Sequence, residues 1–184
     1  MPNDRIGLLV LRDAPINSAD ILARIEALIG SGLPVPPQAE PEPLPVPAPT
    51  SPELAERAIQ IGLQLNGLQP YHLGGRCGRM TFDCRADFDC SSFVNWCFHH
   101  AGATWNLPQT GLLANRLPRV ARDSVRRGDI MVMAVHQGDW GSVEGAHTGI
   151  WLGDGNLLQC GSQKNGIGVW PPVPGWPFVF VRGA

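Results

Sequence analysis

A cysteine stands where the sequence predicts the first turn of a helix. Asp89, just before it, is a good N-cap because its carboxylate can accept a backbone N–H that a helix start leaves unpaired. Cys90 therefore lies at the positive end of the helix dipole, which favours the nucleophilic thiolate, whereas the charge of Asp89 opposes it. A nucleophilic role requires a base, and a small buried cysteine is the alternative interpretation. Apolar residues then recur at helical spacing until Gly102, at Phe93, Val94, Cys97, Phe98 and Ala101.

Among the five histidines, His147 is the best candidate for that base. It lies at the start of a predicted strand, 146–152, in which Gly149 shares its face and leaves room for another element to approach. His99 and His100 lie at the far end of the cysteine helix, roughly 13–15 Å along its axis at 1.5 Å per residue. We expect those two to complement the helix C-terminus instead.

A third group should orient the imidazole, and Gln159 is the candidate. It follows His147 by twelve residues, across a predicted turn at 153–156. The two side chains face the same way only if this hairpin has an odd-numbered loop or a bulge. Gln159 can accept the imidazole N–H and fix the tautomer. Because it carries no charge, it should add little to the stability of an imidazolium.

The elements that must position these residues are predicted as helices first and strands afterwards. A helix begins at Pro52 and runs to about Gly67, and the cysteine helix follows. The chain between 103 and 129 is expected to be irregular. This order indicates an α+β domain with an antiparallel sheet, whose strands are predicted at 130–135, 146–152, 157–160, 167–170 and 178–182.

Two segments of different composition precede this domain, which we assign to 53–184. Residues 1–33 suggest a short strand followed by an amphipathic helix, too small to bury its own apolar stripe. We expect this element to dock on the main domain, on another copy or on a partner protein. Residues 34–52 hold nine of the eighteen prolines and are expected to form an extended, semi-rigid linker.

Composition excludes several classes of partner. The net charge of −2 and the scattered arginines argue against nucleic acid. The apolar run at 6–11 is too short for a signal peptide or a membrane span, so we expect no membrane insertion. We therefore expect synthesis in a reducing cytoplasm, with free thiols. The spacing of Cys77, Cys84 and Cys90 does not match a zinc site.

Four short motifs, in this order, resemble the NlpC-type cysteine peptidases, and they span most of residues 52–182. The resemblance implies a papain-like α+β fold in which the Cys90 helix packs on a five- or six-stranded sheet carrying His147. It also implies hydrolysis of peptide bonds in peptidoglycan stems, commonly between D-glutamate and the diamino acid, without metal or cofactor. The motifs are Pro70-Tyr71-x-x-Gly74-Gly75, Phe88-Asp89-Cys90-Ser91, Arg127-Gly128-Asp129 and Ala146-His147-Thr148-Gly149-Ile150-Trp151-Leu152-Gly153-Asp154-Gly155.

The resemblance also suggests roles for residues around the nucleophile. Tyr71 matches the family's motif tyrosine, whose hydroxyl would lie near the reacting carbonyl, and Ser91 is a candidate for substrate or oxyanion binding. Gln159 stands where the family usually has histidine. Ser92 replaces a frequent glycine and is expected to narrow a subsite. We interpret 135–145 as a loop bordering the cleft, with Trp140 as a candidate substrate contact.

Wall hydrolysis without a signal peptide suggests a phage lytic enzyme. It would be made in the host cytoplasm and either released through a holin as an endolysin or carried on a virion tail, docked through residues 6–29. Two alternatives remain: a related amidase that cuts the sugar–peptide link, and a non-catalytic module that binds wall peptide or serves as a virion structural part.

Overall fold

The structure is a computed structural model that describes residues 52–67, 71–142, 145–162 and 166–184. All of them belong to one unit of the chain, residues 44–184. The expected N-terminal element, 1–33, and the expected linker, apart from Pro52, lie outside the described residues, so both stay predictions. No helix in the described ranges is long and apolar enough to cross a membrane.

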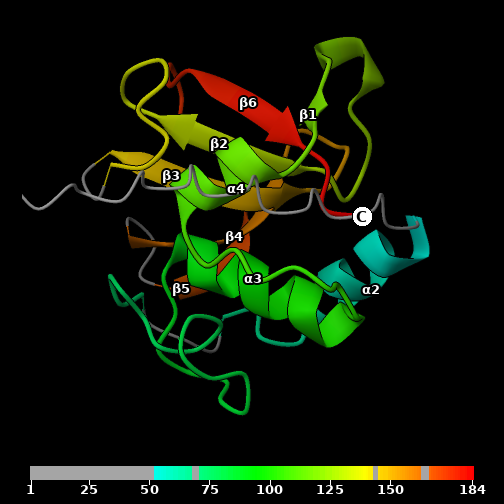
Figure 1. The fold of residues 1–184 in the computed structure, drawn as a ribbon, viewed down its shortest axis with the longest axis vertical. Helices are drawn as coiled ribbons and strands as arrows, with labels where there is room; N and C mark the ends of the chain where they lie inside the picture. Colours follow the sequence, from blue (N-terminus) through cyan, green and yellow to red (C-terminus); the bar gives the residue numbers. More distant parts are fainter. Residues whose placement is uncertain (1–51, 68–70, 143–144, 163–165) are drawn as a thin grey trace, which may run out of the picture. The chain divides into compact units, whose positions relative to one another are not determined.

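In the described residues, helices pack on an antiparallel sheet whose strand order differs from the sequence order (Figure 1). This confirms the predicted α+β class. The strand order is β1-β6-β2-β3-β4-β5, so six strands are present. The helices are α2 (Pro52–Leu63), α3 (Cys90–Ala101) and α4 (Thr110–Arg116), with a 3₁₀ turn, η1 (Arg122–Ser124). The strands are β1 (Arg119–Val120), β2 (Ile130–Ala134), β3 (Ala146–Trp151), β4 (Leu157–Gly161), β5 (Gly166–Trp170) and β6 (Phe178–Val181).

The start and end of α3 follow the sequence prediction. The Asp89 side chain accepts from the backbone N–H of Ser92, and the Ser92 hydroxyl accepts from the backbone N–H of Asp89, which forms a capping box. Gly102 ends the helix in the left-handed conformation, with φ 106°. Ser92 is fully buried in this cap and lines no cavity described below, so the expectation that it narrows a subsite is wrong.

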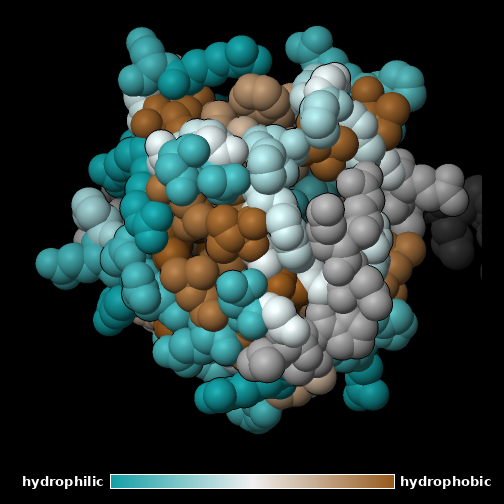
Figure 2. Space-filling view, turned by 180° about the vertical axis from the view of Figure 1, so that it is seen from behind, coloured by the Kyte–Doolittle hydropathy of each residue, from teal (hydrophilic) through white to brown (hydrophobic). Residues whose placement is uncertain are grey.

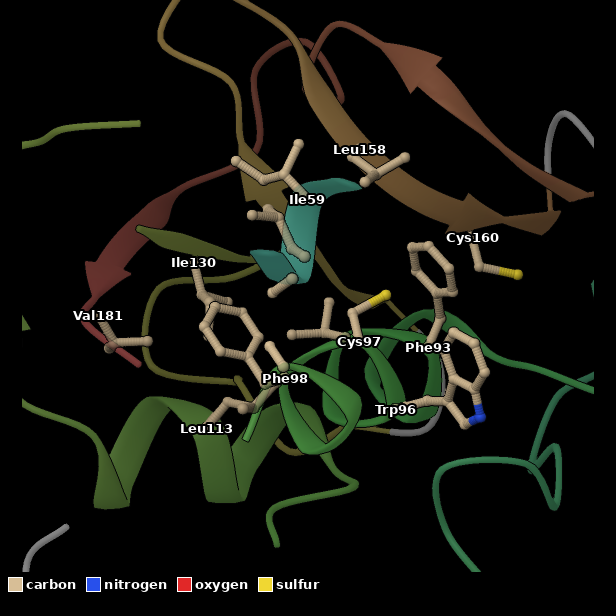
Figure 3. Close-up of a cluster of buried hydrophobic side chains, with 14 of the residues drawn as sticks. Ile59, Phe93, Trp96, Cys97, Phe98, Leu113, Ile130, Leu158, Cys160 and Val181 are labelled. Carbon is tan, nitrogen blue, oxygen red and sulfur yellow. The ribbon is translucent and has the colours of Figure 1, made fainter. Parts of the chain in front are cut away.

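The core lies between the helices and one face of the sheet. In Figure 3 the side chains of α3 point toward strands that carry Ile130 and Leu158, with Ile59 of α2 beside them. Strand β2 alternates across the sheet: Val132 belongs to this core, whereas Met133 belongs to a second apolar cluster with Phe180. The helix-side core therefore fixes α3, and with it Cys90, against the sheet.

The second cluster belongs to the other face of the sheet, which no described helix covers. The chain between β5 and β6 packs there, because Val173 and Trp176 contact it. On the face seen in Figure 2, apolar residues gather near the middle, with hydrophilic residues to the left and below. Apolar atoms normally form more than half of a folded protein's surface, so this pattern alone indicates no partner.

Sequence reasoning missed α4, β1 and η1, which lie in the segment expected to be irregular. Helix α4 has seven residues and buries only Thr110, Leu113 and Ala114, which is too short for a periodic pattern to stand out. Strand β1 has two residues and exists through its pairing with β6. Both elements depend on tertiary contacts that a local pattern does not contain.

One expectation about the cysteines is wrong. Cys77 and Cys84 form a disulfide, whereas the expected reducing compartment implied free thiols by default. Cys90, Cys97 and Cys160 are free and buried. The sequence separation of seven between Cys77 and Cys84 does not by itself indicate a disulfide, and the turn at 77–84 brings the two sulfurs together.

Candidate active site

Cys90 is the first residue of α3 and lies at the wall of a cavity of 340 Å³, here called the Cys-side cavity. Only 6% of the residue is exposed, so it is buried yet open to that cavity. Other lining residues come from the loops before α3, from α3 itself, from the start of α4 and from the start of β3. They include Tyr71, Arg79, Ser91, Gln109, Thr110 and Ala146.

Burial dominates the acidity of the Cys90 thiol. Burial first, and then the charge of Asp89, raise the pKa of Cys90 to about 12. Hydrogen bonds from the backbone N–H groups of Thr148, Ser91 and Cys90 itself act in the opposite direction and are outweighed. The sequence prediction weighed only the helix dipole against Asp89. With burial included, Cys90 is a thiol at neutral pH and needs a base to become nucleophilic.

His147 lies near the start of β3 and lines a second cavity of 510 Å³, here called the His-side cavity. Its Nε2 lies 2.5 Å from Oε1 of Gln159 on β4. Burial lowers the pKa of His147, and the hydrogen bond with Gln159 offsets part of that effect. The imidazole is therefore neutral near pH 7 and can accept a proton.

The Gln159 amide is held in one orientation. Its nitrogen donates to the backbone carbonyls of Trp170 at 3.0 Å and Pro171 at 3.4 Å, so its oxygen faces the imidazole. An amide oxygen only accepts, so Nε2 of His147 must carry the ring proton. Nδ1 is then the unprotonated nitrogen. The hydrogen bond expected from the sequence is present, and it assigns Nδ1 as the basic atom.

The register of β3 and β4 explains why these two side chains meet. Ile150 pairs with Leu158 and Trp151 pairs with Leu157, which leaves a five-residue loop, 152–156. That odd number is what the sequence argument required. Gly149 supplies the space, because a Cβ built there would lie 3.0 Å from Cβ of Gln159. The element expected to approach this glycine is therefore β4.

Cys90 and His147 open onto one cleft. Tyr71, Leu73 and Ala146 line both cavities, so the Cys-side and His-side cavities adjoin along these residues. The hydrogen bond from the Thr148 N–H to the sulfur also brings Cys90 to the residue that follows His147. The arrangement thus unites a thiol, a neutral imidazole and an orienting amide at a single cleft.

Tyr71 and Ser91 have different environments in that cleft. Burial, followed by the nearby charges of Cys90 and Asp89, raises the pKa of Tyr71, so its hydroxyl remains a proton donor. The Ser91 hydroxyl lies 3.0 Å from the Pro108 carbonyl and 3.2 Å from Oδ1 of Asp89. Ser91 lines the cleft, but its hydroxyl is turned toward the structure around the start of α3.

Trp140 is not placed as the sequence predicted. It is 8% exposed, belongs to the hydrophobic core and lines neither cavity. The guanidinium of Arg119 lies 5.8 Å from its ring centroid. The next two residues, Gly141 and Ser142, line the Cys-side cavity instead. The loop therefore borders the cleft as expected, but through these small residues, while the tryptophan anchors it.

Sequence reasoning missed much of the cleft wall. On the Cys side it missed Arg79 and the start of α4. On the His side it missed an apolar wall from the end of β5 and the chain after it, namely Trp170, Pro171, Pro172, Val173, Pro174 and Trp176. A tryptophan- and proline-rich run between two strands is the signal that would have found this wall.

The described residues contain no group of three or more His, Cys, Asp or Glu side chains that could ligate a metal ion. Asp87, Asp89 and His72 are instead engaged in hydrogen bonds around the start of α3 and the preceding loop. The chemistry that the cleft offers from its own side chains is proton transfer and nucleophilic attack by sulfur.

Comparison with known proteins bears on this arrangement. A model of the NlpC/P60 family matches residues 68–173, more than half of the chain. The peptidoglycan DL-endopeptidase CwlO of Bacillus licheniformis is 32% identical over 110 residues, which are 59% of this chain and 23% of that protein. The chain thus matches less than a quarter of that relative's length.

Solved structures share the fold at low identity. The P60 domain of a Mycobacterium avium subspecies paratuberculosis antigen has a TM-score of 0.55 and 22% identity, covering 70% of this chain and 93% of that chain. RipD of Mycobacterium tuberculosis has a TM-score of 0.52 and 18% identity, covering 73% and 100%. RipD is described as a non-catalytic NlpC/P60 domain protein adapted to peptidoglycan binding.

Proposed function

The chain belongs to the NlpC/P60 family of peptidoglycan hydrolases, and from this premise we propose that it is a cysteine endopeptidase that cleaves an amide bond in peptidoglycan stem peptides. Cys90 is the nucleophile, His147 the general base and acid, and Gln159 the residue that orients His147. The bond we propose is the one between D-glutamate and the diamino acid. The name of the relative CwlO, a DL-endopeptidase, supports that choice.

One observation carries the proposal. Cys90 and the hydrogen-bonded pair of His147 and Gln159 open onto the same cleft, with the Cys90 sulfur at the backbone N–H of Thr148. A nucleophile, a base and a group that orients the base form the arrangement that acyl transfer requires. A buried structural cysteine would need no neighbouring base and no cavity.

The two pKa shifts support a neutral thiol–imidazole pair before attack. As the sulfur attacks the amide carbonyl, Nδ1 of His147 takes the thiol proton. The backbone N–H of Cys90, at the start of α3, and the Tyr71 hydroxyl are the donors available to the developing oxyanion. His147 then gives its proton to the leaving amine, and a thioester remains on Cys90. Water, deprotonated by His147, releases the acid and regenerates the thiol.

The two cavities divide the substrate between them. The leaving amine must lie at His147, so the amine-side residue of the substrate occupies the His-side cavity, and the acyl-side residue occupies the Cys-side cavity. Arg79 and several polar residues are among those that line the Cys-side cavity. The His-side cavity is lined on one side by the tryptophans and prolines of 170–176. A peptide with chemically different residues on either side of the cut bond suits this cleft.

Digestion of purified peptidoglycan tests the proposal, with the released fragments identified by mass spectrometry. We expect fragments cut within the stem peptide, and we expect Cys90→Ala and His147→Ala to abolish their release while circular dichroism stays native. Cys97→Ala removes a thiol from the same helix but outside the cleft, and it should retain activity.

Each other outcome has a defined meaning. Fragments cut at the sugar–peptide link would assign the protein as an amidase. Wall binding without release of fragments would place it with non-catalytic relatives such as RipD. Near-native hydrolysis by either cleft variant would remove the proposed mechanism.

We further propose that the protein acts outside the cytoplasm, where its substrate lies. The Cys77–Cys84 disulfide supports this, since disulfides persist mainly in oxidising compartments. Release through a holin, carriage on a virion tail and docking through residues 6–29 stay predictions.

A further inference from the structure

A disulfide-closed loop lies against the start of the cysteine helix. Residues 77–84, here called the disulfide loop, are closed by Cys77 and Cys84. The Gly78 carbonyl accepts a hydrogen bond of 2.6 Å from Nδ2 of Asn95 on α3. Gly78 has a φ of 73°, and a Cβ on it would lie 1.9 Å from the Ser92 carbonyl oxygen. Only glycine allows this approach, so one end of the loop is fixed to α3.

The other end of the disulfide loop is fixed through Phe82. Its carbonyl accepts from Nε1 of Trp96 at 3.0 Å and lies 2.9 Å from Nε2 of His100. Its ring stacks on His99 with the centroids 3.7 Å apart. His99 and His100, which the proposed mechanism does not use, therefore help to hold this loop on α3.

Arg79 lies between these two attachment points and reaches the residue beside the nucleophile. Its Nη2 lies 2.6 Å from Oδ2 of Asp89, and both side chains are mostly buried. Arg79 also lines the Cys-side cavity together with Cys90. One oxygen of the Asp89 carboxylate thus meets the Arg79 guanidinium, and the other accepts from the backbone N–H of Ser92 in the first turn of α3.

The cap on α3 does not require this arginine. Asp89 already accepts hydrogen bonds from the backbone N–H groups of Ser92 and Gly74. The Arg79 Nε is buried without a hydrogen-bond partner among the described residues, which costs free energy. The Asp89 carboxylate therefore has hydrogen-bond donors without Arg79. We infer that Arg79 is placed there for its positive charge and not for its hydrogen bond.

We propose that Arg79 is a positioning residue held in place by the disulfide loop. Its positive charge offsets the negative charge of Asp89, and this makes it easier for Cys90 to form the thiolate that the reaction requires. The inference rests on the proposed nucleophilic role of Cys90. Asp89 is needed as the N-cap of α3 but opposes a second negative charge one residue later. The positive charge of Arg79 reduces the repulsion between the capping carboxylate of Asp89 and a thiolate at Cys90.

Other titratable groups also face Cys90 and remain in place when Arg79 is changed. They are Tyr71 in the cleft and Cys160 on β4, while His147 on β3 lines the adjoining His-side cavity. Tyr71 lies within electrostatic reach of Cys90, Asp89 and Arg79, and Arg79 contacts Asp89 directly. An effect of Arg79 on the ionisation of Cys90 must therefore be identified by comparing variants.

Alkylation of Cys90 tests the inference independently of hydrolysis. The rate of iodoacetamide reaction at Cys90 is followed against pH by peptide mass spectrometry, without reductant, so that the disulfide remains closed. In Arg79→Gln we expect the profile to move to higher pH by about one unit, with alkylation at pH 7 about tenfold slower. Arg79→Lys, which keeps the charge, should restore most of the rate.

Two further variants separate charge from structure. Arg76→Gln removes a neighbouring, exposed arginine that has no contact with Asp89, and it should leave the profile unchanged. Asp89→Asn keeps an N-cap residue, and in Arg79→Gln/Asp89→Asn the profile should return toward wild type because neither charge remains. A purely structural role for Arg79 would instead make the two changes additive.

The disulfide has its own test. Cys77→Ser/Cys84→Ser should shift the alkylation profile in the same direction as Arg79→Gln. An unchanged alkylation profile in Arg79→Gln overturns the inference. An unchanged profile in Cys77→Ser/Cys84→Ser shows that the disulfide is not needed to position Arg79. If the Arg79 shift occurs while Cys90→Ala still hydrolyses peptidoglycan, the proposed function fails and the electrostatic role of Arg79 stands.

Discussion

Oε1 of Gln159 lies 2.5 Å from Nε2 of His147, so the imidazole is oriented by a neutral amide. The amide fixes which ring nitrogen carries the proton and leaves the charge of an imidazolium uncompensated. Burial lowers the pKa of His147, and no carboxylate opposes that effect at this contact. The third residue therefore sets the pH range of the site as well as its geometry.

Replacing Gln159 by glutamate should move the acid limb of the pH–activity profile. In the native protein His147 remains an unprotonated base to a pH below its usual value of about 6.5, and activity falls as pH drops through the lowered pKa. A carboxylate at position 159 favours the imidazolium and raises that pKa. We expect the acid limb of kcat/KM to move up by about one to two pH units.

Gln159→Ala serves as the matched control for that prediction. It removes the hydrogen bond without adding charge, so kcat should fall about tenfold, while the acid limb does not move upward. A glutamate variant whose acid limb coincides with that of the native protein would show that another group controls the titration.

Gly149→Ala should displace Gln159 from His147. The added methyl would lie 3.0 Å from Cβ of Gln159 and 3.1 Å from both Cβ of Leu157 and the Leu158 carbonyl oxygen, so β4 must shift. We expect a loss of roughly 1–3 kcal/mol of unfolding free energy from overpacking, measured by urea titration. The fall in kcat/KM should exceed that of Gln159→Ala, because the whole strand moves.

A second glycine of the same strand pair provides the comparison. At Gly161 the nearest atom to an added Cβ is Cζ3 of Trp170 at 4.0 Å, so Gly161→Ala meets no crowding. Its unfolding free energy should change by less than about 1 kcal/mol. Equal destabilisation of the two variants would contradict the assigned role of Gly149.

The parts of the site that local chemistry determines could be predicted from the sequence. The cap at Asp89, the stop at Gly102 and the open face at Gly149 each follow from what one residue type can do. The meeting of His147 and Gln159 followed from strand parity once the loop proved to have five residues. These features need no knowledge of how the helices and the sheet pack.

The remaining features depend on contacts between distant segments. Trp140 was predicted to contact substrate because it lies in a polar loop. In the structure its ring packs in the hydrophobic core, with the guanidinium of Arg119 over it. Burial raises the pKa of Cys90, and burial is a property of the assembled fold. Arg79 acquired a role only when the disulfide loop placed it beside Asp89.

Two arginine–carboxylate pairs should differ in their contribution to stability. Arg182 donates two hydrogen bonds, of 2.8 and 2.9 Å, to Asp129, which is 2% exposed. Arg182→Ala leaves that carboxylate buried without its partner charge, so we expect a loss of about 3 kcal/mol of unfolding free energy in urea titrations.

Arg127 provides the exposed counterpart. It pairs with Glu56 at 2.8 Å, and the two side chains are 43% and 46% exposed to solvent. Arg127→Ala should cost less than about 1 kcal/mol, and its effect should shrink further in high salt. If the two variants lost the same free energy, the burial of Asp129 would not be the cause.

The apolar wall of the His-side cavity should act in substrate binding. Trp176 comes from the chain between β5 and β6, lines that cavity and lies on the side that the leaving residue of the substrate occupies. Trp176→Ala removes apolar contact that substrate and transition state share, so KM should rise about tenfold while kcat changes little. Met80→Ala, an exposed apolar residue that lines neither cavity, should leave both constants unchanged. A fall in kcat at constant KM would mean that Trp176 instead supports the position of His147 or Gln159, because interactions made only in the transition state lower kcat.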